Sequence, residues 1–116
     1  MVKISGQARR MRIYIGESNK YKGMLLYHAI VLKAKEVGLA GATVFRGIEG
    51  FGATSRIKVA RILDLSNDLP IVIEIVDSIE YIEKLLPFLD EAVTVGLITQ
   101  EDVEIIKYSA KNNTHI

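Results

Sequence analysis

The stretch "PIVIEIVDSIE", residues 70–80, decides the fold that we predict for this chain. Isoleucines at every second position from 71 to 75 define one face of an extended strand, and two valines flank Glu74 on the other face. A strand with two largely apolar faces is typical of the middle of a sheet that is covered on both sides. Asp77 follows the strand as the predicted N-cap of a helix, with Glu80 completing a capping box.

The segments on either side of this strand complete the order β-α-β-β-α-β. Alternating apolar residues predict the other strands, and an apolar stripe at helical spacing predicts a first helix. This order is that of an α+β, ferredoxin-like sandwich, in which two helices cover one face of a four-stranded antiparallel sheet. We predict a single domain over residues 1–116, with a core at about 8–108 and tails at 1–7 and 109–116. The predicted strands cover 11–17, 41–45, 71–76 and a last segment from about Val103, and the predicted helices cover 21–38 and 78–93.

Several residues predict where these elements begin and end. Ser18 or Asn19 is placed to cap the first helix, and Gly38 is placed to end it. Pro87 is expected to kink the second helix or to divide it into two shorter helices. Residues 55–70 alternate only in part, which indicates an extended arm or loop.

The composition limits the classes of function. The formal net charge is +1, which gives no electrostatic reason to expect nucleic acid as a partner. The chain has no cysteine, which excludes disulfides, thiolate zinc sites and cysteine nucleophiles. The start "MVKISGQARR" lacks the apolar core of a signal peptide, and the longest apolar run is too short to span a bilayer. We therefore expect a cytoplasmic protein that does not insert into a membrane.

The hydrophobicity of the chain favours an oligomer. The mean hydropathy is +0.22, which is high for a small domain whose helices cover only one face of its sheet. Val72 and Val76 lie on the predicted uncovered face, where they would meet water in a monomer. Burial between subunits would remove them from water, and Glu74 would then need a partner or a place at the rim. The open alternative is an isoleucine-rich core without an oligomer.

The sequence offers no recognisable set of catalytic residues. His28 lies within the apolar stripe of the first helix, which favours a core or interface histidine over a metal ligand, and His115 lies in the C-terminal tail. No serine or threonine has a base placed to activate it. We expect no metal site, no required cofactor and no enzymatic activity.

The stretch "FRGIEGFGATSR", residues 45–56, is the candidate binding segment. Its glycines expose backbone N–H groups and permit positive φ, so the chain can curl around an anion. Arginine and lysine nearby suit phosphate contacts, although a flexible hairpin with solvated arginines has the same pattern. The residues of this candidate anion site are Arg46, Gly47, Gly50, Gly52, Arg56 and Lys58.

Two other uses of such a segment fit less well. The glycine-rich loop of acylphosphatases, which share this fold, follows the first strand, whereas this segment follows the second. RNA-recognition domains stack bases on several aromatic residues, whereas Phe51 stands alone here. A small acylphosphatase-like hydrolase and a purely structural oligomeric module remain the alternatives to a binding protein.

The segment and its neighbours resemble a known family. Residues 37–52, "VGLAGATVFRGIEGFG", resemble the second-strand region of PII signalling proteins, in which a Val-Gly-x-x-Gly-x-Thr-Val run leads into Gly-Phe-Gly. Residues 69–76, "LPIVIEIV", resemble the third strand of the same family. From about residue 11 to residue 108, the chain is similar to a family of short PII-like proteins of unassigned cellular role.

This resemblance implies a regulatory homotrimer whose uncovered sheet faces pack inward. It also implies an adenine nucleotide (AMP, ADP or ATP) or a similar anionic effector in clefts between subunits, and a 53–69 loop that contacts a target protein. Residues 94–102, "TVGLITQED", lack the glycine- and lysine-rich phosphate loop of PII, so a mono- or diphosphate fits the resemblance better than a triphosphate. By position, the resemblance implies ligand contacts from Gly41, Thr43, Gly50, Phe51, Gly52 and Thr54.

Overall fold

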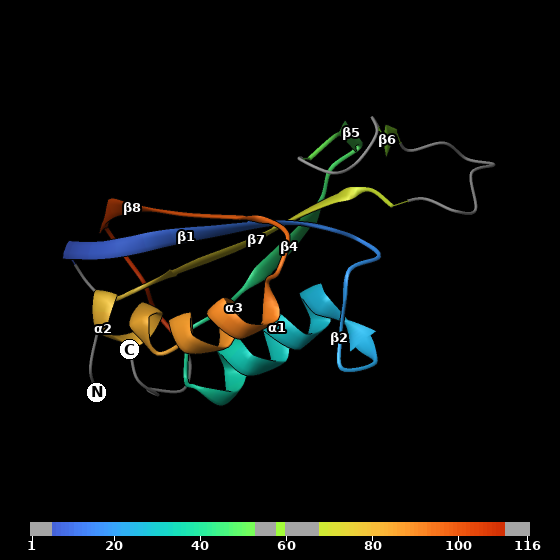
Figure 1. The fold of residues 1–116 in the computed structure, drawn as a ribbon. Helices are drawn as coiled ribbons and strands as arrows, with labels where there is room; N and C mark the ends of the chain where they lie inside the picture. The colour runs from blue at the N-terminus through green and yellow to red at the C-terminus, as the bar shows by residue number, and fades with distance from the viewer. Residues whose placement is uncertain (1–5, 53–57, 60–67, 111–116) are drawn as a thin grey trace.

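The four-stranded antiparallel sheet has the strand order β4-β7-β1-β8 in the computed structural model, which describes residues 6–52, 58–59 and 68–110. Three helices lie on one face of this sheet (Figure 1). The arrangement is the predicted α+β, ferredoxin-like sandwich. The sheet strands are β1 (Gly6–Gly16), β4 (Thr43–Arg46), β7 (Pro70–Asp77) and β8 (Leu97–Ile105), and the helices are α1 (Leu26–Glu36), α2 (Ile79–Glu83) and α3 (Leu86–Ala92). A short hairpin joins β2 (Lys20–Tyr21) to β3 (Met24–Leu25), and β5 (Glu49–Gly50) pairs antiparallel with β6 (Lys58–Val59).

The core lies between β7 and β1 and the three helices. β7 pairs with β4 on one side and β1 on the other, which confirms its predicted place inside the sheet. Its burial alternates along the strand, because every second side chain points toward the helices. Ile73 and Ile13, which face each other across β7 and β1, are fully buried against Ile30 of α1 and Ile82 of α2.

The first helix begins at Leu26 rather than at residue 21. Lys22 and Gly23 have φ values of 47° and 85°, which are the positive values that a two-residue hairpin turn requires. The β2–β3 hairpin therefore occupies the segment that we expected to form the first turn of the helix. Leu25 is the N-cap and has no side-chain capping bond, so the predicted cap at Ser18 or Asn19 is wrong. Gly38, with φ of 92°, follows the helix as predicted.

His28, which the sequence placed within the apolar stripe of this helix, does not lie on the buried side of α1. The helix buries Leu26, Ala29, Ile30 and Ala34. His28 and Leu32 are exposed, so His28 is not a core histidine in this structure. The apolar stripe could not single out the buried side, because apolar residues occur around much of the circumference of this helix.

The second helix is divided as predicted, but its cap differs. Pro87 lies in the first turn of α3, and Lys84 and Leu85 separate that helix from α2. The N-cap of α2 is Ser78, whose hydroxyl accepts a hydrogen bond from the Tyr81 N–H at 3.4 Å. Asp77 is fully buried instead, and its Oδ2 accepts a 2.8 Å hydrogen bond from the Ala40 N–H. The carboxylate therefore joins the end of β7 to the loop after α1.

Two strands are longer than their apolar pattern indicated. β1 begins at Gly6, and β8 begins at Leu97, six residues before Val103. Paired charges replace apolar alternation in these extensions, since Arg9 of β1 lies 3.7 Å from Asp102 of β8. Backbone hydrogen bonds between strands and cross-strand ion pairs do not produce an alternation of apolar residues in the sequence. The ends of β1 and β8 could therefore not be predicted from apolar alternation alone.

The outer face of the sheet, which is the face opposite the helices, carries an apolar row. The register places Phe45, Val72, Tyr14 and Leu97 next to one another across all four strands. Phe45 is 50% exposed and Leu97 is 57% exposed, whereas the isoleucines that point to the helices are buried. The sheet therefore has one complete core and one apolar surface that the described helices leave uncovered (Figure 1).

Candidate functional site

A cavity of about 610 Å³ lies where four separate segments of the chain meet at one end of the sheet. The end of β1, the segment after β5, the start of β7 and the turn before β8 supply its walls. Figure 1 shows β5 and β6 standing beyond the sheet at this end. The lining residues are Tyr14, Ile15, Gly16, Asn19, Gly50, Phe51, Gly52, Asp68, Pro70, Ile71, Val95, Gly96 and Leu97.

Glycines in the binding segment allow it to pack closely against Pro70. A Cβ atom on Gly47 would lie 2.8 Å from the Pro70 Cγ, and a Cβ on Gly50 would lie 3.0 Å from the same atom. The Gly47 N–H also donates a 2.7 Å hydrogen bond to the Pro70 carbonyl. The N–H of Gly47 is thus used within the chain, and this glycine serves close packing rather than offering a bare N–H to an anion.

The loop root, which comprises Glu17–Ser18, Arg46–Gly47 and Asp68–Pro70, is held by several contacts. The Glu17 N–H donates to the Leu69 carbonyl at 2.8 Å, and the Ser18 N–H donates to Asp68 Oδ1 at 2.8 Å. Arg46 forms an ion pair with Glu17, whose side chain is only 16% exposed. The end of β1 is therefore bonded to Arg46, which precedes the 53–69 loop, and to Asp68 and Leu69, the last two residues of that loop.

The structure brings three of the predicted site residues to the cavity. Gly50, Phe51 and Gly52 line it, and Phe51 is 73% exposed. Gly41 and Thr43 are exposed at the start of the edge strand β4 and do not line this cavity. Of the remaining predicted residues, Arg46 is paired with Glu17, Lys58 has its backbone in β6 opposite Gly50, and Thr54 and Arg56 lie outside the described residues.

Polar groups that the sequence reasoning missed also line the cavity. A Cβ on Gly16 would lie 3.1 Å from both Asn19 Oδ1 and Asp68 Oδ1, so both oxygens lie close to the glycine. No lysine or arginine is among the described residues that line the cavity. In the sequence, Asp68 falls only within the expected arm or loop at 55–70, and no pattern shows that residues 14–19, 50–52 and 68–71 meet in space.

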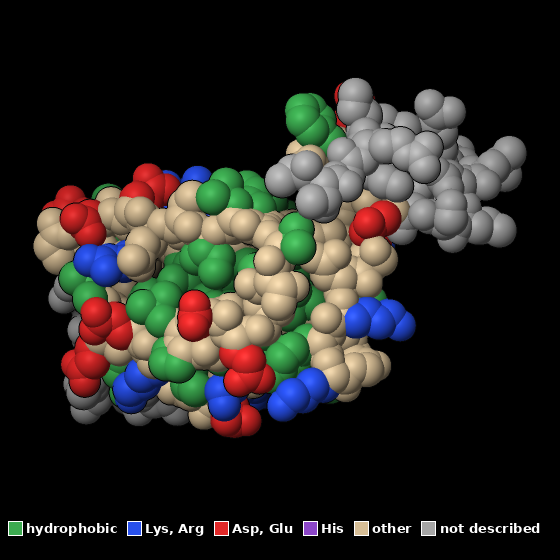
Figure 2. All heavy atoms as spheres, viewed as in Figure 1, with side chains coloured by type: hydrophobic (Ala, Val, Ile, Leu, Met, Phe, Trp, Pro, Cys, Tyr) green, Lys and Arg blue, Asp and Glu red, His purple; other side chains and the backbone are tan. Residues whose placement is uncertain are grey.

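A second, more open hollow of about 480 Å³ lies between α3 and β8. Figure 2 shows hydrophobic side chains gathered in the middle of this side of the molecule, with charged side chains around them. Leu86, Pro87 and Ile98 supply apolar walls, and Glu83 and Asp90 lie at its edge. Because few polar groups converge there, the first cavity is the better candidate for a ligand site.

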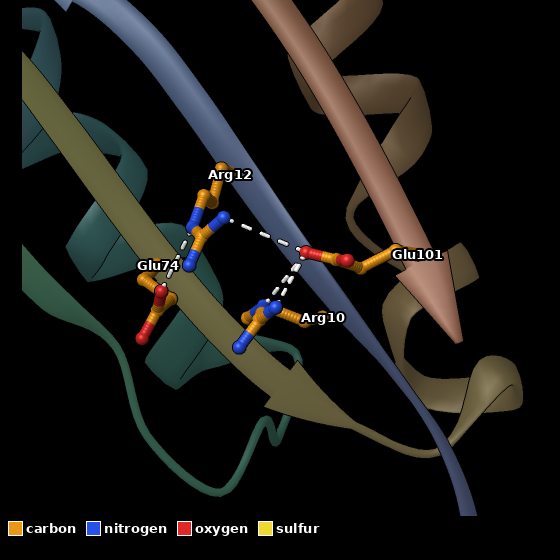
Figure 3. Close-up of polar contacts among 4 residues, drawn as sticks. All are labelled: Arg10, Arg12, Glu74 and Glu101. Atoms are coloured by element: carbon orange, nitrogen blue, oxygen red, sulfur yellow. Dashed lines mark hydrogen bonds and ion pairs between the residues drawn. The ribbon is translucent and has the colours of Figure 1, made fainter. Parts of the chain in front are cut away.

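Charged residues form a network beside the apolar row on the outer face (Figure 3). Arg12 Nε donates to Glu74 Oε2 at 3.0 Å, which supplies the partner that the sequence required for Glu74. Arg10 Nη2 donates to Glu101 Oε1 at 2.6 Å, and Arg12 Nη1 lies 3.5 Å from the same oxygen. The network thus joins β7, β1 and β8 through four side chains.

This network has a consequence for the pH dependence of stability. The hydrogen bond and charge of Arg10 lower the pKa of Glu101 below its ordinary value of 4.5. The unfolded chain therefore binds this proton at a higher pH than the folded chain does. The stabilisation is complete above pH 4.5 and is lost as the pH falls through the lowered pKa.

We predict that Glu101→Gln flattens the decline of the unfolding free energy below pH 4.5, as measured by urea denaturation at a series of pH values. The effect is expected to be small, because Glu101 is 52% exposed and its ion pairs are screened by water. Glu104→Gln on the same strand is the matched control, since Glu104 forms no ion pair with the residues that the structure describes. An identical acid decline in the two variants would contradict the prediction.

Metal ligands do not cluster in the described parts of the chain. Residues 6–52, 58–59 and 68–110 contain no group of three or more acidic or histidine side chains placed to hold a metal ion. No helix in those ranges is long and apolar enough to cross a membrane.

Comparisons with known proteins match most of the chain. Residues 8–105 match the family DUF190, described as "Uncharacterized ACR, COG1993". A UPF0166 protein of Aquifex aeolicus (strain VF5) is 42% identical over 96 residues, which are 83% of this chain and 90% of that protein.

Two solved structures share the fold at low sequence identity. A protein of Thermus thermophilus described as a PII-like signaling protein has a TM-score of 0.62 and 22% identity, over 91% of this chain and 94% of that one. CPII of Thiomonas intermedia K12, a nitrogen regulatory PII-like protein bound to ADP, AMP and bicarbonate, has a TM-score of 0.62 and 15% identity. That likeness covers 87% of this chain and 90% of CPII.

Proposed function

This chain belongs to the DUF190 family and has the fold of PII-like signalling proteins, and we propose that it is a regulatory protein that binds an adenine nucleotide. It acts in the cytoplasm, without catalysis, and presents residues 53–69 to a target protein. The observation that carries the proposal is the cavity beside Gly50, Phe51 and Gly52. CPII, which shares the fold, binds ADP and AMP, and this supports an adenine nucleotide as the ligand.

The position of the cavity supports a regulatory role. Its walls include Gly50–Gly52, where the chain leaves for the 53–69 loop, and Asp68, where it returns. A ligand in the cavity would therefore contact both stems of that segment. Ligand binding and the presentation of the loop to a partner would be coupled, because the same residues serve both.

The apolar row supports the proposal of a homotrimer. Phe45, Val72, Tyr14 and Leu97 form a continuous surface on the outer face, next to a network of charges that is satisfied within the chain. Packing of these faces against one another would remove the row from water without leaving Glu74 unpaired. A trimer would also add walls from neighbouring subunits to the cavity.

We predict that isothermal titration calorimetry detects binding of AMP or ADP with a dissociation constant below about 1 mM, and weaker binding of ATP. Absence of binding for all three nucleotides at millimolar concentration would contradict the nucleotide proposal but not the fold. Acetyl phosphate incubated with the protein is the control for catalysis. Its turnover, lost in Arg46→Ala, would favour the hydrolase alternative.

A further inference from the structure

We propose that Asp68 determines which part of the ligand lies beside Gly16: an uncharged group that donates hydrogen bonds, rather than a phosphate. This inference deepens the proposed function and rests on it. Asp68 is thus a specificity-determining residue. It comes from the return stem of the 53–69 segment, so it also ties ligand identity to the loop root.

The geometry leaves Asp68 with unused acceptor capacity at the cavity wall. Its Oδ1 accepts one hydrogen bond, from the Ser18 N–H at 2.8 Å. A carboxylate can accept about four hydrogen bonds, and the described residues give Asp68 no other hydrogen bond. Its Oδ1 and Oδ2 lie 3.1 and 3.6 Å from the position of a Cβ on Gly16. Because Gly16 has no side chain, nothing from that residue separates the carboxylate from the cavity.

The surroundings of the carboxylate disfavour a phosphate at this position. Asn19 Oδ1, a second acceptor, lies 3.1 Å from the same Cβ position. The nearby Arg46 is paired with Glu17 and does not line the cavity. A phosphate beside Asp68 would meet a like charge that no lysine or arginine among the described lining residues compensates, whereas a hydroxyl or amino group would gain a charge-assisted hydrogen bond.

An adenine nucleotide carries two kinds of neutral donor that could make this contact. They are the ribose hydroxyls and the 6-amino group of the base. Both groups would donate a hydrogen bond to Asp68. Nucleotide analogues that lack one group or the other show which of the two makes the contact. The exposed ring of Phe51 lines the same cavity and offers an apolar surface for the base or sugar.

The test measures dissociation constants by calorimetry for AMP, 2′-deoxy-AMP, 3′-deoxy-AMP and purine riboside monophosphate. The wild-type protein is expected to bind AMP about tenfold more tightly than the analogue that lacks the contacted donor. In Asp68→Asn that ratio is expected to fall to about twofold, because a charge-assisted hydrogen bond is replaced by a neutral one. The amide oxygen of Asn can still accept from the Ser18 N–H, so the thermal midpoint is expected to stay near that of the wild type.

Asp90→Asn is the matched control, since Asp90 lies on α3 and does not line the cavity. It is expected to keep the wild-type ratio. Equal affinity of the wild-type protein for all four ligands would overturn the role of Asp68 while leaving nucleotide binding intact. An undiminished ratio in Asp68→Asn would do the same. If none of the four ligands binds the wild-type protein, both this inference and the proposed function fail.

Discussion

Replacing Val72 by glutamate is expected to turn the proposed trimer into monomers without unfolding the subunit. Val72 lies in the interior strand β7, between Phe45 of β4 and Tyr14 of β1 in the apolar row. A carboxylate at this position would enter the middle of any interface that the outer face forms. Burying a charge without a partner costs about 3–5 kcal/mol. A cost of this size lowers the association constant by more than about 100-fold for each glutamate that is buried in the interface.

The subunit is expected to remain folded in the Val72→Glu variant. Val72 is only partly buried, and the isoleucines on either side of it, which point toward the helices, are unchanged. Loss of β propensity costs less than about 1 kcal/mol. Circular dichroism is therefore expected to show native secondary structure, while sedimentation velocity shows a mass near 12.9 kDa.

Leu32→Glu is the matched control for this experiment. Leu32 is 46% exposed on α1, which lies in the helix layer rather than on the outer face of the sheet. The same change of charge and size at that position is expected to leave the oligomer intact. If the Val72 variant stays a trimer, or if the wild-type protein is a monomer, the outer face is not the interface.

The interior of the sheet could be predicted from the sequence because its signal is local and repetitive. The alternating isoleucines of 71–75 place their own strand and show which face meets the helices. The ends of elements depend on other forces. The Lys22–Gly23 turn replaced the first helical turn, and cross-strand pairs such as Arg10–Glu101 extended β1 and β8 where no apolar alternation exists.

The candidate site could be predicted only in the part that forms one continuous motif. Gly50, Phe51 and Gly52 are adjacent in sequence. The resemblance to PII proteins predicted all three as ligand contacts, and all three line the cavity. Asp68 and Gly96 reach the same cavity from distant segments. Their roles follow from strand order and register, because β1 lies between β7 and β8 and brings both neighbours to its end. No local pattern contains that information.

Gly96→Ala is expected to destabilise the fold and to reshape the cavity together. A Cβ on Gly96 would lie 2.7 Å from the Tyr14 carbonyl oxygen and 3.1 Å from the Ile15 Cγ2. The nearest of these atoms belongs to the backbone, so a change of side-chain rotamer cannot relieve the contact. The start of β8 must instead move away from the end of β1. Overpacking of this kind costs about 1–3 kcal/mol. The thermal midpoint is expected to fall by about 4 °C for each kcal/mol, as measured by calorimetric melting.

Gly41→Ala provides the matched control for stability, because nothing lies within 4 Å of a Cβ at that glycine. It is expected to keep the wild-type midpoint. In Gly96→Ala the same displacement moves cavity walls, since Gly96, Tyr14 and Ile15 all line the cavity. AMP affinity should therefore fall at a temperature where the variant is still fully folded. If the thermal midpoint falls while the AMP affinity stays unchanged, AMP does not bind in this cavity. A ligand in the cavity would contact the turn at Gly96, so a shift of that turn would change its affinity.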